Sequence, residues 1–169
     1  MVSAPSLQRR AFLRGRQALE TPLRPPWAGD EGAFLDVCTS CLACVAACPA
    51  GVLVEGDGRH PVFDPRRGEC TFCAACVEAC APHALDFGRA EQPWQLKAEI
   101  GTACLAQRGV VCLSCRDVCG EAAIRFRPAP GGARPDLDRE RCTGCGACVG
   151  VCPTAAIVVA PAKEAGRER

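Results

Sequence analysis

The sequence predicts an α+β fold in which four similar units follow one another along the chain, two in each of two lobes. Its 16 cysteines fall into four groups of four. The gaps from the last cysteine of one group to the first of the next are 22, 24 and 23 positions. An aliphatic residue follows five positions after each last cysteine: Leu53, Leu85, Ile124 and Ile157. This even period indicates an internal repeat.

The spacing inside the groups indicates iron–sulfur chemistry. The pattern C-x2-C-x2-C-x3-C is typical of a cubane [4Fe-4S] cluster. Two groups have it with a proline directly after the last cysteine: Cys38, Cys41, Cys44 and Cys48, and Cys142, Cys145, Cys148 and Cys152. A third has it with the proline one residue later: Cys70, Cys73, Cys76 and Cys80. The remaining group is C-x7-C-x2-C-x3-C: Cys104, Cys112, Cys115 and Cys119.

Two other uses of cysteine are less consistent with this pattern. A disulfide scaffold scatters its cysteines along the chain, whereas these form tight groups suited to metal. Zinc also accepts four thiolates, but its sites usually combine two separate C-x2-C hooks. The three-hook run therefore favours four [4Fe-4S] clusters, with all sixteen cysteines binding iron.

Each unit is expected to contain a strand, a cysteine loop, one or two helical turns and a second strand. The segments 62–63 and 136–138 precede groups, and 85–87, 124–126 and 157–159 follow them. We expect a first lobe over residues 31–95 and a second over 96–160. The Pro/Gly-rich stretch 128–132 lies between groups and predicts a turn inside the second lobe.

The two ends of the chain differ from the repeats. Residues 1–30 are expected to form a basic arm, helical over about 6–19, and a Pro-Pro-Trp segment. Arg9-Arg10 resembles the start of a twin-arginine export signal, but the continuous apolar run that such a signal needs does not follow. Trp27 either anchors a partner or packs against the first lobe. Residues 161–169 are expected to be a charged tail.

Charge and composition narrow the function further. The formal net charge is +1; four oxidised clusters, each about −2 with their thiolates, would lower it to about −7. We therefore expect no nucleic-acid partner, and no stretch is long enough to span a membrane. His60 is expected in a loop and His83 at the surface, so neither suggests catalysis, and we predict that the protein is not an enzyme. With a small organic core, the clusters must help to hold the fold.

At these residues the chain resembles the bacterial two-cluster ferredoxins, twice in tandem. In that family the fourth cysteine of each run binds the other cluster of the pair. Carried over to neighbouring groups, the resemblance implies four ligand sets: Cys38, Cys41, Cys44 and Cys80; Cys70, Cys73, Cys76 and Cys48; Cys104, Cys112, Cys115 and Cys152; Cys142, Cys145, Cys148 and Cys119. A nested pairing, with the outer groups together and the inner groups together, is the alternative.

A narrower resemblance covers nearly the whole chain. The stretches Arg9-Arg10, 24–27, 29–31, 100–106 and 124–128 are similar to the NapF family of ferredoxin-type accessory proteins of periplasmic nitrate reductase systems. This resemblance implies a cytoplasmic protein that binds the precursor of the nitrate reductase catalytic subunit and assists the insertion or reduction of its iron–sulfur cluster before export. An electron donor is a further implied partner. A ferredoxin-type electron carrier, or an electron-transfer subunit of a redox complex, is the alternative.

Overall fold

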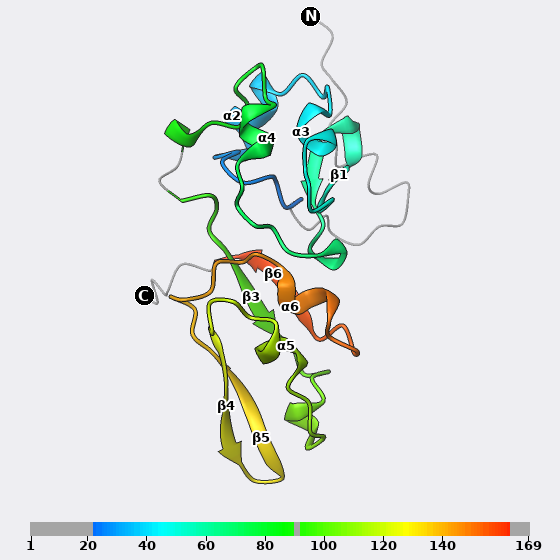
Figure 1. Cartoon of the computed structure of the whole chain (residues 1–169), viewed down its shortest axis with the longest axis vertical. Coiled ribbons are helices and arrows are strands. Elements are labelled where there is room, and N and C mark those ends of the chain that lie inside the picture. Colours follow the sequence, from blue (N-terminus) through cyan, green and yellow to red (C-terminus); the bar gives the residue numbers. More distant parts are fainter. Residues whose placement is uncertain (1–21, 90–91, 163–169) are drawn as a thin grey trace, which may run out of the picture.

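The computed structural model describes residues 22–89 and 92–162, which form two lobes placed one after the other along the longest axis (Figure 1). The predicted arm helix over 6–19 and the charged tail from residue 163 lie outside the described residues. The N-terminal half of the chain forms the upper lobe in the picture, and the C-terminal half forms the lower lobe.

The first lobe is built around one short hairpin. Its elements are α2 (Glu31–Val37), α3 (Ala43–Ala46), β1 (Leu53–Glu55), the 3₁₀ turn η1 (Asp57–Arg59), β2 (Pro61–Phe63), the 3₁₀ turn η2 (Pro65–Arg67), α4 (Ala75–Glu78) and the 3₁₀ turn η3 (Phe87–Arg89). β1 pairs antiparallel with β2, with Leu53 opposite Phe63. The strand predicted at 62–63 is thus present.

Helix α2 has a clear local cause. Asp30 caps its N-terminus, and the Asp30 Oδ1 accepts hydrogen bonds from the N–H groups of Gly32 (2.9 Å) and Ala33 (3.3 Å). Asp at this position satisfies donors that have no partner inside the helix. The helix then buries Phe34 completely. It ends at Cys38, so it delivers the first cysteine of its group.

A closing segment, residues 22–30, takes the place of an edge strand in the first lobe. Trp27 donates to the carbonyl of Pro93 (2.6 Å) and accepts from the N–H of Asp86 (3.1 Å). Pro25 and Pro26 have no N–H and cannot continue a ladder. The strand predicted over 85–87 is therefore wrong: this stretch bends and enters η3.

Trp27 is buried, with 8% of its surface exposed, and its ring meets Phe87 edge-on at 5.0 Å. The Arg24 guanidinium holds the same segment in place. It forms an ion pair with Glu31 at 2.7 Å, donates to the Pro61 carbonyl at 3.1 Å and lies over the Phe34 ring. Of the two predictions for Trp27, packing on the first lobe is confirmed and an exposed anchor is wrong.

The second lobe has two small antiparallel sheets. Its elements are β3 (Leu96–Ile100), the 3₁₀ turn η4 (Ala106–Arg108), α5 (Ser114–Asp117), β4 (Ile124–Ala129), β5 (Gly132–Leu137), α6 (Ala147–Gly150) and β6 (Ile157–Pro161). β3 pairs with β6, with Ile100 opposite Ile157, and β4 pairs with β5. The strands predicted near 124, 136 and 157 are present, and 130–131 form the predicted turn.

The helices after the cysteine loops are single turns of four residues. A left-handed residue precedes each of three: Leu42 (φ 62°) before α3, Ala74 (φ 64°) before α4 and Gly146 (φ 92°) before α6. Non-glycine residues in this conformation cost about 1–3 kcal/mol each. Helices this short are not stable in isolation, so tertiary contacts must hold them.

The described core is one contiguous cluster of buried apolar residues that includes cysteines from all four groups. Phe34, Phe63 and Leu85 are among its largest fully buried side chains. Within the described ranges, no helix has the length and apolar character required to cross a bilayer; α2, the longest, has seven residues.

Candidate metal-cluster sites

The fold gathers the sixteen cysteines into four sets, each drawn from two groups of one lobe. Three sets line cavities. Site 1 contains Cys38, Cys41, Cys44 and Cys80. Site 2 contains Cys70, Cys73, Cys76 and Cys48. Site 4 contains Cys142, Cys145, Cys148 and Cys119. These are the sets of the neighbouring pairing, in which the last cysteine of each group crosses to the other site.

Site 3 is defined by the thiols that surround Cys115. Burial raises the pKa of Cys115 to about 11, and the neighbouring thiols of Cys104, Cys112 and Cys152 raise it too. Cys152 therefore lies with the third group although it belongs to the fourth in sequence. The four members of site 3 are Cys104, Cys112, Cys115 and Cys152.

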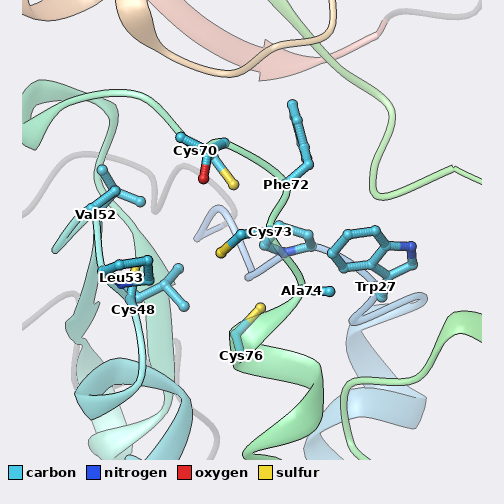
Figure 2. A pocket seen from close by; sticks show the side chains of 13 residues that line it. Trp27, Cys48, Val52, Leu53, Cys70, Phe72, Cys73, Ala74 and Cys76 are labelled. Atoms are coloured by element: carbon cyan, nitrogen blue, oxygen red, sulfur yellow. The ribbon is translucent and has the colours of Figure 1, made fainter.

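Figure 2 shows how site 2 is arranged. The sulfur atoms of Cys70 and Cys73, from the loop, and of Cys76, from α4, face a common space, and Cys48 lies on the opposite wall. Val52 and Leu53 complete an apolar lining. The cavities of sites 1, 2 and 4 enclose about 300, 350 and 870 Å³, open mouths included.

The donor sets fit iron–sulfur clusters. Every set offers four thiols, and all sixteen cysteines are free of disulfide bonds. Among residues 22–89 and 92–162, no three His, Cys, Asp or Glu side chains are placed to hold a single ion. One zinc ion would draw its sulfurs to about 2.3 Å. The cavities lined by sites 1, 2 and 4 have room for a larger group.

Backbone N–H groups donate to several of the sulfurs, and four of these hydrogen bonds are 3.4 Å long or shorter. Three follow the last cysteine of a group: Leu85 donates to Cys80 (3.4 Å), Ala123 to Cys119 (3.4 Å) and Ala156 to Cys152 (3.2 Å). The fourth comes from strand β3, where Ala98 donates to Cys142 (3.4 Å). Such bonds stabilise a thiolate and raise the reduction potential of a cluster that it holds.

The same turn follows the last cysteine of every group and directs the N–H groups that donate to Cys80, Cys119 and Cys152. The residue three positions after each last cysteine donates to the carbonyl of that cysteine and is left-handed: Gly51, His83, Ala122 and Ala155. The chain thereby folds back so that the next amides face the sulfur. The sequence carries no obvious signal for this turn, because only Gly51 is a glycine.

Burial dominates the electrostatics of the thiols. It raises the pKa of Cys44 and Cys70 to about 11 and that of Cys76 and Cys148 to about 12. These thiols therefore resist ionisation on their own. Bound iron would supply the positive charge that makes four adjacent thiolates favourable, which couples metal binding to folding.

Two cysteines behave differently. A hydrogen bond from the Ala43 backbone and one from the Thr39 side chain lower the pKa of Cys41, which is exposed. At Cys152 burial acts to raise the pKa, but hydrogen bonds from the backbones of Thr154, Ala156 and Ile157 outweigh it and lower the value. The backbone around these thiols already favours the thiolate form.

The third group differs from the others in its loop. The segment between Cys104 and Cys112 is held by local hydrogen bonds: η4 forms there, and the N–H of Val110 donates to the carbonyl of Leu105 (3.0 Å). Arg108 also donates to the Thr102 carbonyl (3.1 Å). The segment differs in exposure: Val110 is 51% and Val111 is 90% exposed, directly before Cys112.

The two histidines have distinct surroundings. His83 is exposed, as predicted. His60 is half-buried and lies 3.2 Å through Nδ1 from the hydroxyl of Ser40, a left-handed residue between Cys38 and Cys41. His60 therefore supports the loop of site 1, a role that the sequence did not suggest.

The chain is similar to known iron–sulfur proteins. Residues 37–85 and residues 110–156 each match a family described as a 4Fe-4S dicluster domain. The chain is 44% identical over 151 residues to the ferredoxin-type protein NapF of Escherichia coli (strain K12), which covers 88% of this chain and 92% of the relative.

Two further relatives extend this comparison. The ferredoxin-type protein NapF of Haemophilus influenzae is 39% identical, with 96% of this chain and 99% of the relative covered. The methylamine utilization ferredoxin-type protein MauM of Paracoccus denitrificans is 36% identical over 77% of this chain and 66% of the relative. The two dicluster matches confirm the predicted α+β class and tandem arrangement, and they indicate [4Fe-4S] clusters. The boundaries of the lobes and the sixteen ligands stay predictions.

Proposed function

The chain belongs to the NapF family of ferredoxin-type proteins, and from that premise we propose that it is an iron–sulfur accessory protein for the precursor of the periplasmic nitrate reductase catalytic subunit. In this proposal it binds the precursor in the cytoplasm and assists the insertion or reduction of the precursor's iron–sulfur cluster before export. The observation that carries the proposal is the 44% identity over 88% of the chain.

We assign one [4Fe-4S] cluster to each of the four sites, held by the sixteen cysteines in the neighbouring pairing. The cysteine-lined cavities and the amides directed at sulfur support this assignment. The clusters supply one-electron redox chemistry when bound. The residues of the chain hold the iron, exclude water and set the charge around it, and we assign them no catalytic step.

Site 3 is the site best placed to face a partner. Val110 and Val111 form an exposed apolar pair beside Cys112. Exposed apolar side chains are favourable once a partner covers them. Cys104 and Cys112 are only half-buried behind them. We infer that the precursor contacts the second lobe at this pair and also binds the basic N-terminal arm.

The structure limits the region of the N-terminus that can be tested by deletion. The Leu23 carbonyl accepts from Phe63, and Pro25 and Pro26 are fully buried. Deleting residues 1–30 would therefore damage the first lobe. Deletion of residues 2–21 leaves the closing segment intact and removes only the basic arm. Deletion of residues 163–169 is the matched control at the other end.

The test is anaerobic. Cluster-loaded protein is mixed with purified, cluster-free precursor, and complex formation, transferred iron and recovered nitrate reductase activity are followed. We expect binding and recovered activity with the full chain, loss of both without residues 2–21, and retention of both without residues 163–169. Absence of binding by the full chain would refute the accessory role.

An electron carrier is the second candidate, and one observation favours it. The second cysteine of the first two groups, Cys41 and Cys73, is exposed, so a cluster at site 1 or 2 would have an edge close to solvent. A redox donor could reach it there. If the loaded protein passes electrons to an acceptor but never binds the precursor, the carrier function replaces the accessory function.

A further inference from the structure

We propose that the junction between the lobes is an electron bridge from site 2 to site 4, held closed by Gly146 and Trp94. The four sites then form a single series in the order 1, 2, 4, 3. The inference rests on the proposed function in one respect, the occupancy of the four sites by clusters. It does not depend on the client protein.

The bridge is a direct hydrogen bond between two proposed ligands. The N–H of Cys70, in site 2, donates to the carbonyl of Cys145, in site 4, at 2.8 Å. Electron tunnelling falls steeply with distance and proceeds more readily along bonds than across gaps. Between these two sulfurs the path consists of two cysteine residues and one short hydrogen bond. It crosses from one lobe to the other without an intervening side chain.

Glycine at position 146 permits this approach. A Cβ at Gly146 would lie 2.8 Å from the Cβ of Pro65, 3.0 Å from Cζ of Phe63 and 3.2 Å from the Gly68 carbonyl oxygen. All three neighbours belong to the first lobe. The corresponding positions in the first lobe are Leu42 and Ala74, which share the left-handed conformation but carry side chains. A side chain at 146 would push the lobes apart.

Trp94, near the end of the first lobe, holds the same junction together. Its indole Nε1–H donates to the carbonyl of Thr143, in the loop of site 4, at 2.8 Å. Its ring packs on Phe63 at 4.7 Å and meets Phe72, in the loop of site 2, at 5.4 Å. One side chain therefore contacts the loops of both sites and fixes their separation.

The cavity of site 4 shows the same arrangement. Four of its lining residues come from the first lobe: Glu69, Cys70, Thr71 and Phe72. The cavity of site 1, in contrast, is lined only by residues of its own lobe. Sites 1 and 2 exchange Cys80 and Cys48 inside the first lobe, and sites 3 and 4 exchange Cys152 and Cys119 inside the second. Site 2 and site 4 are thus the inner members of the series, and sites 1 and 3 are its ends.

The step that this geometry serves is the transfer of one electron. The donor cluster is oxidised by one electron, the acceptor cluster is reduced by the same electron, and no bond forms or breaks. A low-potential one-electron reductant supplies the electron, with dithionite as the probe. Cys70 and Cys145 provide the path, and Gly146 and Trp94 are positioning residues.

The test uses the loaded, full-length protein without any client. After full reduction, EPR spectra report which clusters are magnetically coupled. We expect the wild type to show one coupled set of four. Gly146→Val should weaken the coupling between lobes and shift the spectrum towards that of two separate pairs. Gly131→Val is the matched control, since Gly131 is also left-handed (φ +82°) but has open space around it, and it should match the wild type.

Trp94→Phe is the second variant, because valine beside Cys145 risks the loss of a cluster. Phenylalanine keeps an aromatic ring but removes the Nε1–H bond to Thr143, and coupling between lobes should weaken with no iron lost. Wild-type coupling in Trp94→Phe, or in an iron-replete Gly146→Val protein, would overturn the proposal. So would a wild-type spectrum of two separate pairs. Each result stands whether or not the protein binds the nitrate reductase precursor.

Discussion

The two lobes carry the same cysteine repeat but are closed in different ways. In the second lobe, β3 and β6 form a regular antiparallel ladder. In the first, the corresponding ends are Pro25–Trp27 and the bent stretch before η3, joined by the hydrogen bond from the Asp86 N–H to the Trp27 carbonyl. The Arg24–Glu31 ion pair holds the first of these ends against α2. A cluster-binding lobe therefore does not require the ladder. It requires that its two ends be held together, which buried side chains can do equally well.

The lobes also differ in charge. Residues 22–95 contain five arginines and ten acidic residues, whereas residues 96–162 contain eight basic and six acidic residues. Negative charge near a cluster disfavours its reduction. The difference in charge therefore favours electrons settling in the second lobe.

Removal of iron should have the largest effect on stability and should unfold both lobes. Their α-helices are four to seven residues long, and six of the twenty residues in their buried core are cysteines, so without metal too little structure remains stable. Treatment with an iron chelator under reducing conditions should abolish the near-UV circular dichroism and the cooperative unfolding transition. A chelated protein that still unfolds cooperatively would show that the organic core is sufficient.

Loss of one ligand should affect a single site. Cys145→Ser should cost roughly a quarter of the bound iron, because one of four proposed clusters loses a ligand. It should also loosen the junction, since Cys145 accepts the Cys70 hydrogen bond. Iron and sulfide per chain give the measurement, with Thr143→Ser as the control in the same loop. An unchanged iron count would contradict the ligand assignment.

The packing of the closing segment, residues 22–30, can be tested without changing a proposed cluster ligand. Trp27→Ala removes a buried indole and its contact with Phe87, so it should destabilise the protein by about 3–5 kcal/mol. Trp94→Phe, at the lobe junction, should cost much less because the ring is retained. Denaturant unfolding of the loaded protein measures both. Equal costs would mean that Trp27 does not close the first lobe.

The Arg24 ion pair should contribute less than Trp27. Arg24 is 12% exposed and Glu31 is 35% exposed, so Arg24→Met should cost about 1–2 kcal/mol after allowance for solvent screening. Arg59→Met is the control, because Arg59 pairs with Glu55 at the surface and should change stability by no more than about 0.5 kcal/mol. The midpoints of denaturant unfolding measure both costs, provided that the variants keep the same dependence of unfolding free energy on denaturant concentration. A cost for Arg24→Met no greater than the control would exclude a role in closure.

The smallest expected effect concerns the reduction potentials. Clusters of the first lobe should have lower potentials than those of the second, and the difference should shrink with salt because the screening length falls from about 10 Å at 0.1 M to about 3 Å at 1 M. EPR-monitored redox titrations at the two salt concentrations measure it. A difference that is reversed, or that grows with salt, would show that surface charge does not set the order.

Some features of the site follow from local spacing. In three of the four groups the first three cysteines lie within seven positions, as in Cys38, Cys41 and Cys44, so any compact loop brings them together. The strands near Ile124 and Ile157 are equally local, because branched apolar residues favour extended backbone. Leu85 obeys the same pattern, but it forms no strand. Its N–H donates to Cys80 Sγ, and the neighbouring Asp86 N–H donates to Trp27, which follows two prolines that cannot continue a ladder.

By itself, the sequence determined the four cysteine groups, their chemistry and the tandem α+β repeat, because these depend on residues close together in the chain. Only the tertiary structure decided which fourth cysteine crosses to which site, that Trp27 is buried, and that the Cys70 and Cys145 loops meet. Those features depend on the packing of segments tens of residues apart. No local pattern marks Gly146 as the residue that lets two lobes touch; its neighbours, Phe63, Pro65 and Gly68, lie in the other lobe.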